Sequence, residues 1–362
     1  MKTALVYDRI NKWGGAERVL LALHKIFPDA PIYTSVHSSE KTPWAKVFDV
    51  KTSSLQKIKF FHHNNQLIPL LMPRAFESFS FDKYDLVVSI TSEAAKGIIT
   101  KPGTLHICYC LTPTRYLWSG HKDYFSNKFF RLASSPAVSY LRYWDKIAAS
   151  RPDHFVSIST EVQKRIKKYY GIDSEVIFPP VMIKGNTKNK KNNGKYFLLV
   201  SRMSRFSYYK KVNLVIDAFN KLKLPLKIVG SGPMKSGFQR KTKGNIEFLD
   251  DLTDKELAYY YENCKALIFP GIEDFGLVMA EAQSFGKPVI AYRSGGALDI
   301  IIEGKTGEFF KEQNTDSLIA TLKRFDEKRY NYSYILRNAQ KFSFANFKIN
   351  FEKLVKEKIN SL

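Results

Sequence analysis

Short β-rich runs alternate with amphipathic helical segments along this chain, and the alternation occurs twice. In the first half, the run TALVYD is followed by GAERVLLALHKIF, which repeats apolar residues at helical spacing, and then by the run PIYTSV. Strands that alternate with helices favour a parallel sheet covered by helices, so the pattern predicts an α/β fold. The same order starts again in the second half, at YFLLVS and NLVIDAFNKL.

A break in this pattern predicts two domains. The chain has 362 residues, more than a single hydrophobic core usually organises. Pro179 and Pro180 end a strand, and the polar, basic stretch GNTKNKKNNG that follows is typical of a surface segment at a domain junction. We therefore expect an N-terminal domain over residues 1–178 and a C-terminal domain over residues 179–340.

The chain is strongly basic, with 57 Lys and Arg against 34 Asp and Glu and a formal net charge of +23. This charge predicts attraction to an anionic partner, which could be nucleic acid, an acidic membrane face or a phosphorylated small molecule. The three cysteines are too few for a disulfide framework and are expected to be buried thiols. The chain begins without the apolar region of a signal peptide and lacks a long apolar run, so we expect a cytoplasmic protein.

Two segments interleave basic and aromatic residues, Leu55–Phe79 and Arg115–Trp144. This composition is typical of an interfacial helix on an anionic membrane. The alternative is that both segments are long crossover helices that pack on the core. Composition and charge leave both interpretations open.

Two glutamates flank a glycine in FPGIEDFGLVMAEAQSFGKPVIA. Glu273 follows the predicted strand ALIFP, and Glu281 lies eight positions later, in a helix predicted to begin near Phe275. The amides of Phe275, Gly276 and Leu277 would then be first-turn donors, which suit an anionic or hydroxylated ligand. The alternative is an ordinary helix start, with Glu273 complementing the helix dipole and Glu281 on the surface.

Further cations and glycines lie at predicted strand ends in both halves. Arg202 follows the strand YFLLVS and Lys210 precedes the next helix, so both could hold oxygens of a diphosphate. Gly14 and Gly15 lie in the first strand-to-helix turn, where small residues let a phosphate reach backbone N–H groups. Gly230 belongs to the turn IVGSGP, after another strand. Each feature alone could be a solvated loop or an ordinary turn, but together they favour a ligand site.

The order of the segments GGAERVL, SRMS, KKVNLVIDAF, IVGSGP and EDFGLVMAE resembles the family 4 retaining glycosyltransferases of the GT-B fold. The spacing of the two glutamates matches the E-x7-E signature of that family. The segments VYDRINKWGGAERVL and CYCLTPTRYLW further resemble the mannosyltransferase subgroup that acts in O-antigen and exopolysaccharide assembly. The resemblance implies two Rossmann-like domains that face each other across a cleft, with a C-terminal helix, residues 341–362, that packs back on the N-terminal domain.

The resemblance also implies roles for the site residues. Arg202 and Lys210 would hold the donor diphosphate, Glu273 would contact the donor sugar, and Glu281 would accept hydrogen bonds from the ribose hydroxyls. The expected catalytic residues are therefore Glu273, Arg202 and Lys210, and the expected donor-binding residues are Gly14, Gly15, Gly230, Phe275, Gly276, Leu277 and Glu281. Fixed cations can stabilise the charge that develops on the leaving diphosphate, so we expect no metal and no cofactor.

The chain departs from the mannosyltransferase subgroup at two positions. Leu111 and Tyr7 stand where the subgroup usually or often has His, and a leucine cannot donate, accept or ionise. Arg115 and Tyr116 match the subgroup and are expected to line the acceptor side. His121 and Asp123 are candidates for the role of the missing histidine, and a loss of activity is the alternative.

These observations predict a retaining glycosyltransferase at the inner face of the plasma membrane. It would transfer a hexose, mannose from GDP-mannose in the first instance, to a polyprenyl-diphosphate-linked saccharide. A UDP-sugar or dTDP-sugar donor is the alternative within the same fold. A catalytically silent glycosyltransferase-like binding protein is the alternative that Leu111 suggests. Nucleic-acid binding lacks any recognised module in this sequence, so no specific nucleic acid is expected as a partner.

Overall fold

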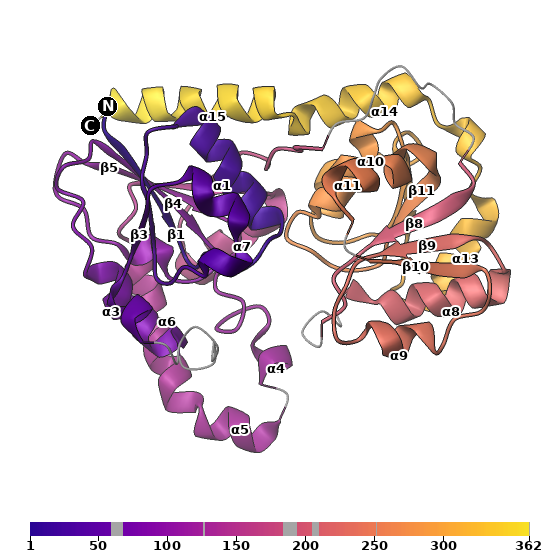
Figure 1. Cartoon of the computed structure of the whole chain (residues 1–362), viewed down its shortest axis with the longest axis horizontal. Coiled ribbons are helices and arrows are strands. Elements are labelled where there is room, and N and C mark those ends of the chain that lie inside the picture. The colour runs from indigo at the N-terminus through magenta and orange to yellow at the C-terminus, as the bar shows by residue number, and fades with distance from the viewer. Residues whose placement is uncertain (59–67, 126, 184–193, 205–209, 251, 362) are drawn as a thin grey trace. The chain divides into compact units, whose positions relative to one another are not determined.

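The computed structural model describes residues 1–58, 68–125, 127–183, 194–204, 210–250 and 252–361 (Figure 1). The chain divides into two compact units, the first made of Met1–Phe178 with Lys348–Leu362 and the second of Pro179–Phe347. The first unit thus includes residues 348–359 of helix α15 (Phe344–Ile359). The predicted returning segment began at residue 341. The predicted junction segment Gly185–Gly194 lies almost wholly outside the described residues.

A seven-stranded parallel sheet forms the centre of the first unit, with the strand order β3-β2-β1-β4-β5-β6-β7. Every residue of β4 and β5 is buried, as expected for parallel strands covered on both faces. Helices α3 and α6 contribute to one hydrophobic core with β1 and β4. The strands are β1 (Thr3–Tyr7), β2 (Ile32–Thr34), β3 (Val50–Thr52), β4 (Leu86–Thr91), β5 (Leu105–Cys110), β6 (His154–Ser157) and β7 (Glu175–Val176). The α-helices are α1 (Gly15–Ile26), α3 (Ile68–Glu77), α4 (His121–Tyr124), α5 (Lys128–Ala133), α6 (Ser135–Ala149) and α7 (Thr160–Tyr170).

The second unit repeats this design with a six-stranded parallel sheet, in the order β10-β9-β8-β11-β12-β13. Its strands are β8 (Tyr196–Val200), β9 (Leu226–Val229), β10 (Ile246–Leu249), β11 (Cys264–Phe269), β12 (Val289–Tyr292) and β13 (Gly307–Phe310). Its α-helices are α8 (Val212–Leu222), α9 (Lys235–Gln239), α10 (Asp254–Asn263), α11 (Leu277–Ser284), α12 (Ala297–Ile300), α13 (Thr315–Arg324) and α14 (Tyr332–Ala339).

In both sheets the first strand of the unit lies in the interior. The next two strands in the sequence extend the sheet on one side of it, and the later strands extend the sheet on the other side. The order reverses between β1 and β4 in the first unit and between β8 and β11 in the second. Ligands of open parallel sheets bind beyond the carboxyl ends of the strands at such a reversal. Each unit therefore has one edge where a site is expected.

Local capping sets the helix ends. The Ser159 side chain accepts a hydrogen bond from the Val162 amide at 3.1 Å, and Gly171 ends α7 with φ of 77°, as the sequence predicted. The predicted start of α11 near Phe275 is wrong by two residues. Gly276 has φ of 87°, which is not helical, so the helix begins at Leu277.

Hydrophobic packing fixes α8 against its sheet. Val215 and Phe219 on the buried face of this helix share a core with Phe197 of β8 and Ile228 of β9. The ring centroids of Phe197 and Phe219 are 5.4 Å apart, with the rings edge to face. This packing determines where Lys210, two residues before α8, is placed. The three cysteines are buried free thiols, as expected.

The two basic aromatic segments have different environments. In Leu55–Phe79, residues 59–67 lie outside the described part of the chain, whereas Met72 and Phe76 of α3 are buried in the core. The segment Arg115–Trp144 forms α4, α5 and most of α6, and Figure 1 shows α5 extending away from the sheet of the first unit. Among the described helices, none is long and apolar enough to cross a membrane.

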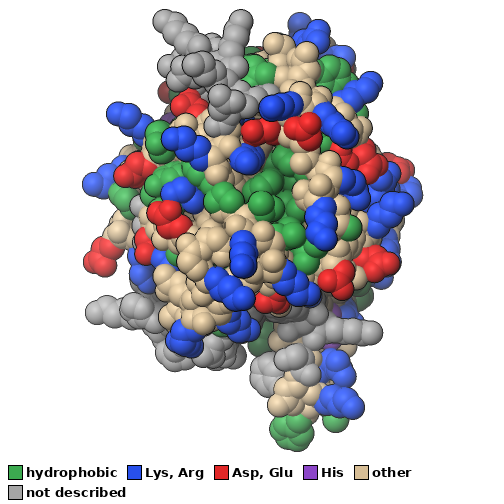
Figure 2. Space-filling model, turned by 90° about the vertical axis from the view of Figure 1, so that its right-hand side faces the viewer, with side chains coloured by type: hydrophobic (Ala, Val, Ile, Leu, Met, Phe, Trp, Pro, Cys, Tyr) green, Lys and Arg blue, Asp and Glu red, His purple; other side chains and the backbone are tan. Residues whose placement is uncertain are grey.

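The positive charge is spread over the face drawn in Figure 2. Lys and Arg side chains alternate there with Asp and Glu around a central apolar area. A nucleic-acid footprint usually gathers Lys and Arg on one stripe or patch. This face therefore carries no such stripe among the residues that are described.

Candidate functional site

The structure brings Lys210 and Glu273 together at the strand-order reversal of the second unit. Glu273 lies in the loop after β11, and Lys210 lies directly before the residue that caps α8. The Lys210 ammonium forms an ion pair with Oε1 of Glu273, and the two side chains are 19% and 18% exposed. Arg202, two residues beyond β8, is exposed at the same edge of the sheet. Three side chains that the sequence singled out for a diphosphate and a sugar thus come from neighbouring strand ends.

The backbone next to Lys210 is held in an unusual conformation. Lys211, the residue that caps α8, has φ of 51° and ψ of 37°, in the left-handed region. A residue with a side chain adopts this region at a cost of about 1–3 kcal/mol, and such residues cluster at functional sites. The strained turn directs the chain from residue 210 into α8. Residues 205–209, on the other side of Lys210, lie outside the described part.

The turn IVGSGP supports the segment that carries Arg202. Gly230 has φ of 139°, and a Cβ atom there would lie 2.1 Å from the carbonyl oxygen of Ser201. The Met203 amide donates to the Ser231 carbonyl at 2.9 Å. These glycine-dependent contacts press the turn against Ser201–Met203, so Gly230, predicted to bind the donor, is also needed for close backbone packing.

The turn after β12 holds the Glu273 loop in the same way. The Gly296 amide donates to the Glu273 carbonyl at 2.9 Å. A Cβ atom on Gly296 would lie 2.2 Å from the carbonyl oxygen of Phe275. Phe275 is buried, and its ring lies edge to face with Phe342 at 5.4 Å. The loop that presents Glu273 and leads into Gly276 and α11 is therefore fixed from two sides.

Glu281 is buried in α11 with 3% exposure, so the alternative that placed it on the surface is wrong. Its Oε2 accepts a hydrogen bond from the Tyr261 hydroxyl at 2.8 Å. Tyr261 is itself fully buried and stacks on Phe285 with ring centroids 5.2 Å apart. A buried carboxylate is costly without such a donor, so Tyr261 orients and stabilises Glu281.

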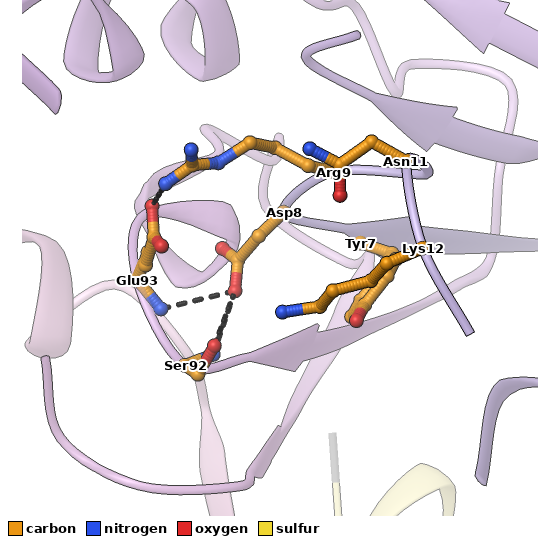
Figure 3. Close-up of a pocket in the computed structure, with 7 residues that line it drawn as sticks. All are labelled: Tyr7, Asp8, Arg9, Asn11, Lys12, Ser92 and Glu93. Carbon is orange, nitrogen blue, oxygen red and sulfur yellow. Dashed lines mark hydrogen bonds and ion pairs between the residues drawn. The ribbon is translucent and has the colours of Figure 1, made fainter. Parts of the chain in front are cut away.

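A second polar site lies at the strand-order reversal of the first unit. A pocket of about 240 Å³ opens there, beyond the ends of β1 and β4 (Figure 3). Figure 3 shows the Lys12 side chain directed into the pocket, with the ion pair between Arg9 and Glu93 across from it. The pocket is lined by Tyr7, Asp8, Arg9, Asn11, Lys12, Ser92 and Glu93.

Asp8 joins β1 to the loop that follows β4. Its Oδ1 accepts from the amides of Ala94 and Ala95, both at 2.8 Å, and its Oδ2 accepts from those of Ser92 and Glu93 at 2.6 and 3.0 Å. Burial raises the pKa of the Asp8 carboxyl and the Glu93 carboxylate adds to the rise, while the amide hydrogen bonds oppose it. The carboxylate thus occupies a cluster of backbone donors and fixes Glu93 beside the pocket.

The predicted acceptor-side residues form one turn near this pocket. The Arg115 carbonyl accepts from the Gly120 amide at 2.8 Å, and His121 Nδ1 lies 3.0 Å from the Tyr116 carbonyl oxygen. Burial raises the pKa of the Tyr116 phenol well above its ordinary value, Glu93 raises it further, and the Arg9 guanidinium lowers it. Tyr116 therefore lies in the electrostatic field of the Arg9–Glu93 pair, whereas His121 is engaged within its own turn.

The two positions that depart from the mannosyltransferase subgroup lie at strand ends of the first unit. Leu111 follows β5, is 8% exposed and donates its amide to the Thr91 carbonyl at 2.8 Å. The Tyr7 hydroxyl, at the end of β1, donates to Oε1 of Glu17 at 2.7 Å. This bond ties β1 to the first turn of α1, where Gly14 is the capping residue and Gly15 is the first helical residue.

Asp8, Arg9 and Glu93 were not among the site residues predicted from the sequence. A signal was present, because DR directly follows the run that forms β1 and SE directly follows the run that forms β4. Polar residues just beyond buried strands are candidates for a site. Without the strand order, nothing indicated that these two ends are neighbours.

Comparison with known proteins finds a family match that lies within the second unit. Residues 184–342 match the model of the family Glycosyl transferases group 1. The D-rhamnosyltransferase WbpZ of Pseudomonas aeruginosa is 28% identical over 199 residues, which cover 52% of this chain and 51% of WbpZ. The O-antigen chain mannosyltransferase C of Escherichia coli is 26% identical over 182 residues, which cover 46% of each protein. The chain thus spans about half the length of the curated relatives it matches.

The fold extends over the whole chain. The crystal structure of Anabaena HepE in complex with UDP and glucose matches with a TM-score of 0.69 at 18% identity and covers 100% of both chains. The fold is therefore GT-B, with two Rossmann-like units, as the sequence predicted. All the site residues predicted for the second unit lie within the matched range 184–342.

Proposed function

We propose that this chain, whose residues 184–342 match the model of the family Glycosyl transferases group 1, is a retaining glycosyltransferase that uses a nucleotide-sugar donor. The main support for this proposal is the ion pair between Lys210, which precedes α8, and Glu273, which follows β11. Arg202 is exposed at the same edge of the sheet. In this proposal Lys210 would bind phosphate and Glu273 would bind sugar hydroxyls, and their contact supports one site for both parts of the donor.

The proposed reaction assigns one task to each side chain. The bond between the anomeric carbon and the β-phosphate oxygen breaks, and an acceptor hydroxyl oxygen bonds to the same face of that carbon. The hydroxyl proton passes to an oxygen of the leaving diphosphate. Arg202 and Lys210 stabilise the negative charge that develops on this diphosphate, so no metal is required. Glu273 binds the sugar, and Glu281 binds the ribose hydroxyls from a position that Tyr261 fixes.

We propose mannose from GDP-mannose as the first donor to test. The names of the Escherichia coli relative and of other similar proteins support mannose, while the HepE structure contains UDP, so a UDP sugar is the alternative. A thermal-shift panel of GDP, UDP, ADP and dTDP sugars decides between them. The matching donor at about 100 times its dissociation constant should add about 2.7 kcal/mol of stability.

Turnover measurements complete this test. Release of the nucleoside diphosphate in the presence of a lipid-linked saccharide supports the enzyme. Donor binding without turnover on any acceptor would instead support the silent binding protein suggested by Leu111. A flat thermal response to every nucleotide sugar would contradict the donor site itself.

We propose that helix α5 contacts an anionic membrane, where a polyprenyl-diphosphate-linked acceptor would be found at the inner face of the plasma membrane. Phe129 and Leu132 are 81% and 76% exposed and lie next to the basic residues Lys128 and Arg131 on the same short helix. Apolar side chains that insert into lipid beside cations that meet acidic headgroups are typical of interfacial helices.

Replacing both Phe129 and Leu132 by Ser is expected to weaken flotation with phosphatidylglycerol vesicles at least ~10-fold. Each side chain contributes about 1.5–3 kcal/mol when it is fully buried in lipid, and ~1.4 kcal/mol is tenfold in affinity. Ile349→Ser is the matched control, because Ile349 is 62% exposed on α15, in the same unit. Unchanged flotation of the double variant would contradict the assignment of α5.

A further inference from the structure

A buried carboxylate in α6 collects hydrogen bonds from several separate segments of the first unit. Asp145 Oδ1 lies 2.5 Å from the Lys96 ammonium and accepts from the Thr114 hydroxyl at 2.9 Å. Asp145 Oδ2 accepts from the Trp118 indole at 2.7 Å and from the Tyr170 hydroxyl at 2.8 Å. The side chains of Asp145 and Lys96 are 2% and 1% exposed.

The Asp145 carboxylate favours the charged form of the buried Lys96 side chain. Burial lowers the pKa of the Lys96 ammonium, but the Asp145 carboxylate more than offsets this effect, so the pKa is raised. Buried ion pairs are often no more stable than apolar residues of the same shape. A buried pair of this kind can instead fix how its hydrogen-bond partners are arranged.

Two of the donors to Asp145 flank the predicted acceptor-side residues in the sequence. Thr114 and Trp118 stand on either side of Arg115 and Tyr116 in the sequence, so Asp145 holds both ends of that turn. From the same helix α6, Arg142 Nε donates to the Leu117 carbonyl at 2.7 Å.

The cluster also reaches the pocket at the end of β1. The Lys96 ammonium lies 2.5 Å from the carbonyl oxygen of Glu93, and the Thr114 hydroxyl lies 3.2 Å from the same oxygen. Glu93 lines the pocket and pairs with Arg9. Tyr170 of α7, which donates to Asp145, also contacts the acceptor-side turn, because its hydroxyl interacts with the Thr114 backbone and its ring lies edge to face with that of Trp118 at 6.3 Å.

We propose that Asp145 is a positioning residue for acceptor binding. Its carboxylate binds Thr114 and Lys96, and through them it sets the distance between the Arg115–Tyr116 turn and the Arg9–Glu93 pair. The acceptor saccharide binds between this turn and this pair. The inference rests on the proposed glycosyltransferase function and deepens it, because it assigns the acceptor to a named part of the first unit.

Two variants that each remove one buried threonine hydroxyl from the first unit test this inference. Thr114→Val removes the bond between Asp145 and the acceptor-side turn. Thr104→Val is the matched control, because the Thr104 hydroxyl donates to the Tyr84 carbonyl at 2.8 Å, outside the Asp145 cluster. We expect Thr114→Val to raise the acceptor KM about tenfold and to leave the donor KM unchanged. Thr104→Val should change neither KM more than about twofold, and Thr114→Ser, which restores the hydroxyl, should recover the wild-type acceptor KM.

Amide hydrogen exchange provides a second readout that needs no activity. Exchange over residues 112–120 should be faster in Thr114→Val than in Thr104→Val at matched urea midpoints. Equal effects of the two variants on acceptor KM and exchange, or no effect of either, would overturn the positioning role. Wild-type protein that turns over no acceptor would contradict the proposed function, while the exchange comparison would still decide whether Asp145 positions the turn.

Discussion

Lys210→Met is expected to lower kcat by about 10²–10³-fold while the protein stays folded. The ammonium is proposed to meet the charge that develops on the leaving diphosphate, and loss of one such preplaced charge or donor usually has an effect of this size. The substitution also leaves Glu273, whose side chain is 18% exposed, without its cationic partner beside the site of an anionic ligand. Steady-state kinetics with the identified donor, together with donor affinity from calorimetry, measure both effects.

Lys221→Met is the matched control for this prediction. Lys221 lies in the last turn of α8, is 63% exposed and pairs at 3.6 Å with Asp316. Exposed pairs of this kind contribute about 0–1 kcal/mol, so its removal should leave both kinetics and folding almost unchanged. The role of Lys210 would be refuted if its Met variant kept kcat within about threefold of the wild type.

Gly296→Ala is expected to destabilise the second unit by about 1–3 kcal/mol and to weaken donor binding. The backbone of Gly296 has φ of −63°, which alanine accepts, so the effect is steric. The new Cβ would lie 2.2 Å from the Phe275 carbonyl oxygen, and the loop that carries Glu273 must move to make room. Urea unfolding measures the first effect, and donor titration of the folded variant measures the second.

Gly244→Ala separates this steric effect from the general effect of replacing a glycine. A Cβ atom on Gly244 would meet no atom within 4 Å, and Gly244 has no positive φ. Such a substitution is expected to be neutral or to stabilise by up to ~1 kcal/mol, through the unfolded state. Equal stability and equal donor affinity of the two variants would show that the turn after β12 does not support the Glu273 loop.

Local patterns predicted most elements of both sheets correctly. The run TALVYD contains β1, the helical spacing of GAERVLLALHKIF predicted α1, and Val212–Leu222 forms α8 as expected. Buried parallel strands are near-continuous apolar runs, and amphipathic helices repeat at their own period, so both signals are local. The start of α11 was misjudged because the left-handed conformation of Gly276 depends on how its loop packs.

The second polar site was beyond the reach of local patterns. Asp8 and the loop after β4 are more than 80 positions apart in the sequence, and only the pairing of β1 with β4 brings them into contact. The role of Asp145 was also not visible in the local sequence, because it is one acid among basic residues of an amphipathic helix. Its buried position follows from α6 packing against segments near residues 96, 114 and 170.

Helix α15 makes the chain impossible to divide into its two units with a single cut. The helix begins in the second unit and passes into the first at Lys348. Phe351, which is fully buried, has its ring 6.2 Å from that of Phe27 and 6.3 Å from that of Tyr109. A fragment that stops at Phe178 would lack Phe351 and its contacts with these two rings. Isolating the first unit with those contacts requires a circular permutation or a separately supplied C-terminal peptide.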